Sequence, residues 1–188
     1  MLAFVILACY KKWCATQGAA TMTYPTFALD DIGSLHESAQ VEFKLARGRD
    51  GQGQLPEDIW ATYSSFANTL GGEIILGVRE EHGHFTIEGI PNPLPVLQEF
   101  WEILDDPSRT SHNILAISDV QLIEIMNKKL IRIRVPLAPE HLKPVFIGTD
   151  AYTGTYFRVG DADMHASRKQ VTQMLRRAHH CTKQLKAR

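Results

Sequence analysis

Cysteine is scarce in this sequence, and long apolar runs are missing from it. The cysteines are Cys9, Cys14 and Cys181, and no two of them have the C-x-x-C spacing that zinc and redox sites use. We therefore expect a reducing compartment, the cytoplasm. The apolar stretch at residues 2–10 is far shorter than the roughly 20 residues of a membrane-spanning helix. Its lysines follow it instead of preceding it, which is the wrong order for a secretion signal.

Internal repeats, heptads and a phosphate loop are also missing. Gly77-Val78-Arg79 is not followed by the lysine and serine or threonine of a phosphate loop, so ATP binding by this domain has no local support. The 188 residues, 44% of them hydrophobic, suffice for one ordinary core. We expect one domain at residues 30–178. Residues 1–29 are expected to be an extension that is disordered or not native, and 179–188 a basic, frayed tail.

A net charge of −1 conceals an uneven distribution of charge along the chain. Residues 30–106 have a net charge of −11, whereas residues 107–188 have a net charge of +8. From Met164 onward there are seven lysines or arginines and no acid. A chain divided in this way can hold cations at one place and phosphates at another. Solvated faces that differ in sign by chance are the alternative.

The stretch from residue 35 to residue 78 has the clearest secondary-structure pattern. Apolar residues alternate with polar ones over 35–45, which predicts a half-buried strand with Glu42 and Lys44 on one face. A glycine-rich loop follows at 47–53. Residues 56–70 carry a wide apolar face at helical spacing. The helix should end at Gly71-Gly72, before a buried strand at 73–78.

The rest of the chain alternates between strands and helices. The patterns predict a strand at 85–90, a helix at 93–104 and a hairpin of strands 120–125 and 130–135. Two further strands are expected at 144–147 and 155–159. A last helix at 166–178 should bury Val171, Leu175 and Ala178. The fold class is therefore α+β, a single domain with a mixed β-sheet and flanking helices.

Three carboxylates, Glu37, Glu42 and Glu80, are the candidates for chemistry. Hard divalent cations such as Mg²⁺ are bound by a few carboxylates together with water. A Glu-x-Lys pair beside further acids is typical of metal-dependent nucleases, in which Lys44 would steady charge at the scissile phosphate. Taken alone, the pair Glu42 and Lys44 is more often a solvated strand face.

Several separated segments resemble one family in the order in which they occur. They are residues 37–44 (ESAQVEFK), 65–78 (SFANTLGGEIILGV), 143–147 (KPVFI) and 154–160 (GTYFRVG). These segments resemble the Schlafen AlbA-like domain, also known as the divergent AAA DNA-binding family, over nearly all of residues 34–177. The resemblance implies the Schlafen AlbA-like fold and a nucleic-acid-binding module, in bacteria often part of longer transcriptional regulators or ATP-binding proteins.

The resemblance also implies a site. In the nucleolytic Schlafen members three acids form a metal-dependent RNase centre, and Glu37 and Glu42 match the first two of them. The third falls on Glu80, a glutamate at a position where the family usually has aspartate. With Lys44 these acids would be the catalytic residues, and Mg²⁺ or Mn²⁺ would be the cofactor only if the protein is a nuclease. Many bacterial relatives are described only as DNA-binding.

Our first hypothesis is a DNA- or RNA-binding domain of a transcriptional regulator that contacts phosphates through its basic later strands and terminal helix. The expected nucleic-acid contacts are cationic side chains, namely Arg47, Arg49, Arg132, Arg134, Lys143 and Arg158. Tyr152, Tyr156 and Phe157 are the best placed aromatics for base stacking. The alternatives are a divalent-metal endoribonuclease of Schlafen type and an interaction module of a longer ATP-binding regulator. We expect no membrane partner and leave a homodimer open.

Two other polar features are interpreted structurally. Asn68 precedes Gly71-Gly72, and the sequence favours hydrogen bonds at the helix end over a place on a phosphate path. His82 and His84 are expected to face solvent, because no cysteine or histidine partner for a zinc site accompanies them.

Overall fold

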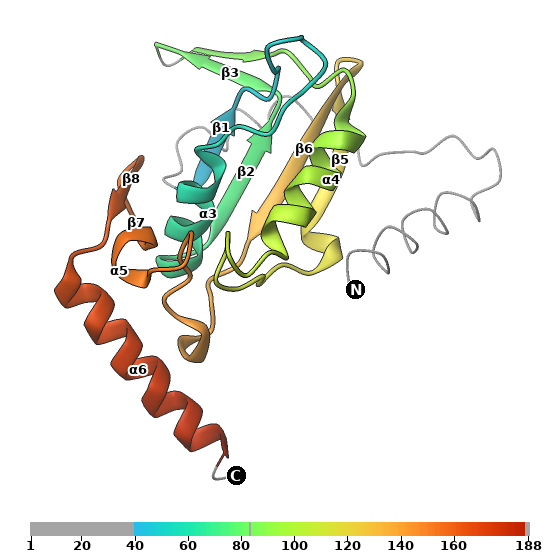
Figure 1. Ribbon diagram of the computed structural model, residues 1–188. Coiled ribbons are helices and arrows are strands. Elements are labelled where there is room, and N and C mark those ends of the chain that lie inside the picture. The colour runs from blue at the N-terminus through green and yellow to red at the C-terminus, as the bar shows by residue number, and fades with distance from the viewer. Residues whose placement is uncertain (1–39, 83, 187–188) are drawn as a thin grey trace.

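A four-stranded mixed sheet forms the centre of the computed structural model, which describes residues 40–82 and 84–186 (Figure 1). Its strand order is β1-β2-β6-β5. β1 (Val41–Lys44) runs parallel to β2 (Gly72–Leu76), and β2 is antiparallel to β6 (Lys128–Val135). β6 forms the predicted hairpin with β5 (Val120–Ile125). The α+β fold with a mixed sheet is therefore confirmed.

Two helices cover one face of this sheet (Figure 1). α3 (Ile59–Asn68) makes the crossover between the parallel strands β1 and β2, and α4 (Pro93–Leu104) lies beside it. The ring of Trp60 stacks on that of Phe100 at 5.4 Å between centroids. Both helices were predicted, because their apolar residues recur at helical spacing and are buried in one core.

The segment between α4 and β5 is tied to α3 by a tyrosine. The hydroxyl of Tyr63 donates a hydrogen bond to the carbonyl oxygen of His112 at 2.9 Å and accepts one from the amide of Ile114 at 3.1 Å. Burial raises the pKa of the Tyr63 phenol far above its ordinary value, so the hydroxyl stays protonated and available as a donor. A short 3₁₀ turn, η1 (Ile117–Asp119), then leads into β5.

The predicted strand at 73–78 is divided at Gly77. β2 ends at Leu76, and a separate hairpin of β3 (Val78–Glu81) and β4 (His84–Ile87) follows. Gly77 has a φ of +100°, and a Cβ there would lie 2.7 Å from a side-chain carbon of Leu130. Only glycine fits this turn easily, and the turn redirects the chain into the second hairpin. The strand expected at 85–90 corresponds to β4.

Residues 144–147 do not form the predicted strand. Phe146 and Ile147 make only isolated bridges, to Thr155 and Thr110. The side-chain amide of Asn68 takes the place of a neighbouring strand, because its oxygen accepts from the amide of Val145 and its nitrogen donates to the carbonyl oxygen of Val145. The structural interpretation of Asn68 is supported, although its partners lie far away in the sequence.

A small hairpin follows a single turn of helix. α5 (Ala151–Gly154) leads into β7 (Tyr156–Val159), which pairs with β8 (Ala162–His165). β7 corresponds to the strand predicted at 155–159 and packs against α3. β8 was not predicted, because its sequence ADMH shows no alternation of apolar and polar residues.

The last helix, α6 (Arg168–Lys186), extends away from the sheet toward the C-terminus (Figure 1). It buries Val171, Met174 and Ala178, whereas Leu175 is 38% exposed, so the predicted inner face was wrong at Leu175. The helix also continues to Lys186 instead of fraying after Ala178. No glycine or proline interrupts residues 179–186. Lys183 and Lys186 stabilise the last turn, because their positive charges lie near the negative end of the helix dipole.

Within residues 40–82 and 84–186, no helix is both long and apolar enough to cross a membrane. The expected N-terminal extension, 1–29, lies outside the described residues.

Candidate functional site

A polar pocket lies where β1, the start of α3 and the β3–β4 hairpin meet. Its volume is about 440 Å³, and it is lined by Glu42, Phe43, Lys44, Leu45, Pro56, Asp58, Arg79, Glu80 and Glu81. Four of these side chains are carboxylates and two are cations, so the lining has a net charge of −2. We call it the acidic pocket. It favours a cation over a phosphate.

Lys44 is the buried cation of the acidic pocket. Only 7% of its side chain is exposed. Its ammonium donates to Glu42 at 3.1 Å and to Asp58 at 2.7 Å. The prediction that Glu42 and Lys44 share a face of their strand is confirmed. Asp58 was not predicted as a site residue, and its position just before α3 in the sequence gave no sign of its pairing with Lys44.

Arg158 connects this site to the β7–β8 hairpin. Its guanidinium donates to Glu42 at 2.7 Å and to Asp163 at 3.0 Å, and it lies over the ring of Phe66. Burial by itself lowers the pKa of Arg158, but the hydrogen bonds to Glu42 and Asp163 outweigh it and keep the pKa above its ordinary value.

Asp163 completes this network from β8. It accepts hydrogen bonds from the hydroxyls of Thr62 and Ser65 on α3. Sequence reasoning missed Asp163, because it lies on the strand that was not predicted. The network therefore joins β1, α3, β7 and β8 through one buried guanidinium.

The predicted metal ligands are only partly brought together. Glu37 lies outside the described residues, whereas Glu42 and Glu80 line the same pocket. Both carboxylate oxygens of Glu42 already accept hydrogen bonds, from Lys44 and from Arg158. In the described part of the chain, no three histidine, cysteine or acidic side chains are close enough to hold a metal ion. The described residues therefore supply only part of the predicted ligand set, since its third member, Glu37, lies outside them.

Most of the predicted phosphate contacts are paired with carboxylates. Arg132 binds Glu73, Arg134 binds Asp119 at 2.6 Å, and Lys143 binds Glu140 at 3.2 Å. Arg158 is 6% exposed. In the loop after β1, Arg47 is 3.5 Å from Glu88, and Arg49 is exposed. The charge of these cations is therefore largely balanced within the fold, and their role in binding stays a prediction.

α6 has the largest group of cations in the described structure that have no acidic partner. It carries Arg168, Lys169, Arg176, Arg177, Lys183 and Lys186 and no acid. Across residues 40–82 and 84–186, none of the six forms an ion pair with a carboxylate. Sequence reasoning noticed this basic run but did not name its residues as contacts. Their helical spacing was the signal that would have identified them.

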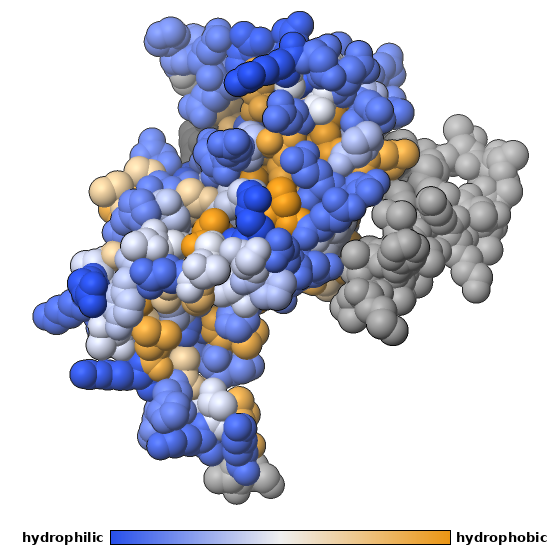
Figure 2. Space-filling model, viewed as in Figure 1, coloured by the Kyte–Doolittle hydropathy of each residue, from blue (hydrophilic) through white to orange (hydrophobic). Residues whose placement is uncertain are grey.

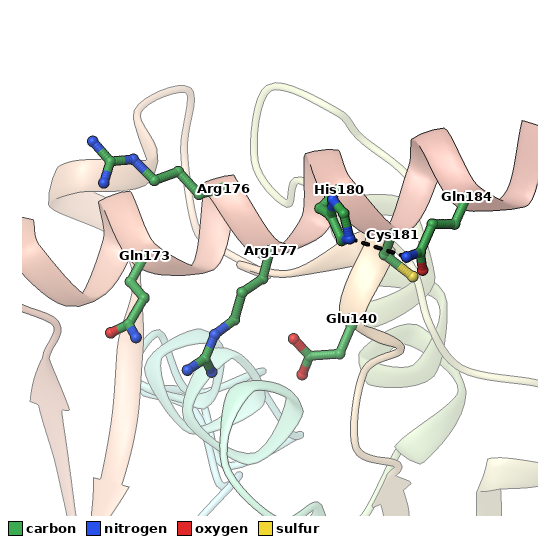
Figure 3. A pocket seen from close by; sticks show the side chains of 7 residues that line it. All are labelled: Glu140, Gln173, Arg176, Arg177, His180, Cys181 and Gln184. Carbon is green, nitrogen blue, oxygen red and sulfur yellow. Dashed lines mark hydrogen bonds between the residues drawn. The ribbon is translucent and has the colours of Figure 1, made fainter.

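A shallow second pocket lies beside α6 (Figure 3). Its volume is about 410 Å³, and Glu140, Gln173, Arg176, Arg177, His180, Cys181 and Gln184 line it. The amide nitrogen of Gln184 lies 3.0 Å from a ring nitrogen of His180.

The aromatics predicted to stack on bases already have partners in the fold. The ring of Tyr156 lies 4.2 Å from that of His165, and the guanidinium of Arg168 lies 4.6 Å from the ring of Tyr152. Base stacking by these residues stays a prediction.

Comparison with known proteins identifies the family of the domain. The family model described as Schlafen, AlbA_2 matches residues 37–167. The solution NMR structure of the N-terminal domain of a RecG-related protein from Nitrosomonas europaea is similar, with a TM-score of 0.51 and 26% identity. That likeness covers 73% of this chain and 90% of the other. No curated protein matches the chain. Because the family model covers well over half of the sequence, the chain belongs to the Schlafen AlbA_2 family.

Proposed function

We propose that this protein is a nucleic-acid-binding domain that contacts the phosphate backbone of DNA or RNA without reading its sequence, as part of a transcriptional regulator. The observation that carries the proposal is the division of charge, −11 over residues 30–106 and +8 over residues 107–188. Within the described structure this division corresponds to an acidic pocket at one site and an unbalanced basic helix at another. Phosphate binding needs cations whose charge is not already neutralised.

The comparisons support the same class of partner. The similar structure is the N-terminal domain of a protein named as related to the ATP-dependent DNA helicase RecG. A family relationship and a similar domain with that name both favour nucleic acid over a small molecule or a membrane.

Binding to labelled nucleic acids tests the proposal. Fluorescence anisotropy with single- and double-stranded DNA and RNA should show binding to each at low salt. The logarithm of the binding constant should fall linearly with the logarithm of salt, with a slope of about −0.7 to −0.9 for each phosphate contact. The absence of binding to all four nucleic acids at low salt would overturn the proposal.

A second candidate function is cleavage of RNA. The observation that favours it is the common pocket of Glu42, Lys44 and Glu80, three of the four residues predicted as catalytic. Lys44 is held at this pocket by two carboxylates, and its ammonium could balance charge on a scissile phosphate. Glu37, Glu42 and Glu80 remain the proposed metal ligands, and Mg²⁺ or Mn²⁺ the proposed cofactor.

A cleavage assay tests this second function. We expect structured RNA to be cut in Mn²⁺ or Mg²⁺ but not in EDTA, and Glu42→Gln to abolish cleavage while binding persists. Glu81→Gln is the matched control, because its 64% exposed carboxylate lines the same pocket. Unchanged cleavage by Glu42→Gln would refute nuclease activity at this site. Thermal melting of both variants shows whether either has lost its fold.

A further inference from the structure

The outward face of α6 carries polar side chains in one straight line. Lys169, Gln173, Arg176, His180 and Lys183 follow one another at alternating steps of four and three residues, and all are exposed. This spacing places them on a single side of the helix. We call them the α6 stripe. The buried residues Val171, Met174 and Ala178 lie on the opposite side, packed against the domain.

The charge of the α6 stripe is not neutralised by the fold. Glu140, in the 3₁₀ turn η2 (Glu140–Leu142), is the acid that lines the pocket beside α6, and it pairs with Lys143 at 3.2 Å. Figure 3 shows Arg177 extending to the side of the helix where Glu140 lies, whereas Arg176 extends to the other side. In the structure described for residues 84–186, no carboxylate forms an ion pair with Lys169, Arg176 or Lys183.

We propose that the α6 stripe is the surface that binds the backbone phosphates of a nucleic acid. This inference rests on the proposed function and specifies where the backbone lies. The stripe begins after residue 167, where the match to the family model ends. The surface is therefore a feature of this chain that the family match does not cover.

The dimensions of the stripe suit an extended polyanion. From Lys169 to Lys183 the helix rises by about 21 Å, at about 1.5 Å per residue. Its three cations are thus about 10 Å apart along the axis, and a duplex carries one negative charge per about 1.7 Å. Gln173 and His180 lie between the cations, and such side chains donate hydrogen bonds to phosphate oxygens. An α-helix also fits the major groove of a duplex.

A membrane surface is a poorer partner for the same cations. Helices that lie in a membrane interface insert a continuous apolar face opposite their basic one. In α6 that opposite face is occupied by Val171, Met174 and Ala178, which are buried against the domain. The large apolar side chains that α6 leaves exposed are Leu175 and Leu185, which are ten residues apart and form no continuous apolar face.

Neutralising the stripe in the full chain tests the inference. The variant Lys169→Gln/Arg176→Gln/Lys183→Gln keeps good helix formers at exposed positions, so the fold should persist. The matched control is Arg109→Gln/Lys128→Gln/Lys129→Gln, which removes the same charge from exposed positions elsewhere. Anisotropy with a labelled DNA duplex and a labelled single-stranded RNA, measured over a range of salt, gives the affinity and the salt slope of each protein.

The stripe variant should bind on the order of 10- to 100-fold more weakly, with a salt slope shallower by about 2 to 3. The control should change the slope by less than about 1. If the wild type binds and both variants lose affinity equally, or neither does, the α6 stripe is not the binding surface. If the wild type binds neither nucleic acid but binds vesicles rich in phosphatidylserine, the proposed function fails as well. The variant Lys169→Arg/Lys183→Arg should bind like the wild type, because it conserves the charge.

Discussion

At the residue scale, the guanidinium of Arg158 joins parts of the chain that are far apart in sequence. It lies between Glu42 on β1 and Asp163 on β8, and Asp163 in turn accepts from two hydroxyls of α3. A carboxylate that loses its cationic partner in such a site still pays the desolvation penalty of being partly buried, and no ion pair offsets that penalty. Arg158 therefore helps to attach the β7–β8 hairpin to the rest of the domain, together with the hydrogen bonds that tie β7 to Asn68 and Ser64 on α3.

Arg158→Met should lower the free energy of unfolding by about 3 kcal/mol or more. The methionine fills similar space over Phe66 but leaves Glu42 and Asp163 without their shared cation. Urea denaturation followed by circular dichroism measures the change. Arg47→Met is the control. The side chain of Arg47 is 59% exposed and forms a long ion pair with Glu88, at 3.5 Å, so this pair should contribute less than about 1 kcal/mol. A smaller loss in Arg158→Met than in Arg47→Met would contradict the role assigned to the network.

Asn68→Ala should destabilise the fold by about 2 to 4 kcal/mol, because it leaves buried backbone groups without partners. The amide of Asn68 bonds both backbone groups of Val145 and the carbonyl oxygen of Tyr156. Differential scanning calorimetry measures the loss. Asn113→Ala, at an exposed position, should cost less than about 1 kcal/mol. If Asn68→Ala retains full stability, the segment at residues 144–147 is held by other contacts.

At the element scale, the turn between α3 and β2 sets the spacing of helix and sheet. Gly71 has a φ of +75°, and a Cβ at Gly72 would lie 2.6 Å from the carbonyl oxygen of Gln40 and 2.7 Å from the ring of Phe66. The strand and helix therefore approach each other more closely here than any side chain allows. At the other end of the same strand and helix, the ammonium of Lys44 on β1 pairs with Asp58, just before α3, at 2.7 Å.

Gly72→Ala should lower the free energy of unfolding by about 2 to 3 kcal/mol through overpacking. The control is Gly51→Ala, in the loop after β1. A Cβ at this position meets nothing within 4 Å, but the alanine must still adopt the φ of +74°. It should cost only about 1 kcal/mol of backbone strain. Thermal melting of both variants measures the difference. Equal destabilisation would show that backbone strain, and not the contact with Phe66 and Gln40, limits this turn.

Elements with a local pattern could be predicted from the sequence. α3, α4 and the β5–β6 hairpin were predicted because their apolar periods match their burial. The break at Gly77 and the strand β8 were missed, because one depends on contact with Leu130 and the other lacks alternation. In the site, Glu42 and Lys44 follow from the period of a single strand. Asp58 and Asp163 do not, since tertiary packing alone brings them together with Lys44 and Arg158.

At the scale of the whole molecule, the two signs of charge are concentrated on different elements. The acidic pocket is formed by β1, the approach to α3 and the β3–β4 hairpin, whereas the α6 stripe lies on the last helix. Figure 1 shows the β3 hairpin and α6 at opposite ends of the view, and Figure 2 shows hydrophilic residues over both regions of this face. At physiological ionic strength, salt screens the interaction between exposed charges beyond a Debye length of about 8 Å. The two sites should therefore bind their partners independently.

The variant Glu80→Gln/Glu81→Gln tests this independence. At physiological salt it should change nucleic-acid affinity by less than about twofold, because its charges act only over a Debye length of about 8 Å. At low salt, where the Debye length grows, the loss of two negative charges should strengthen binding modestly. Combined with the stripe variant in a double-mutant cycle, the effects on binding should add to within about 0.5 kcal/mol, as expected of distant sites. A coupling energy above about 1 kcal/mol would mean that one nucleic acid contacts the acidic pocket and α6 together, and the polyanion would then have to follow a path across the domain between them.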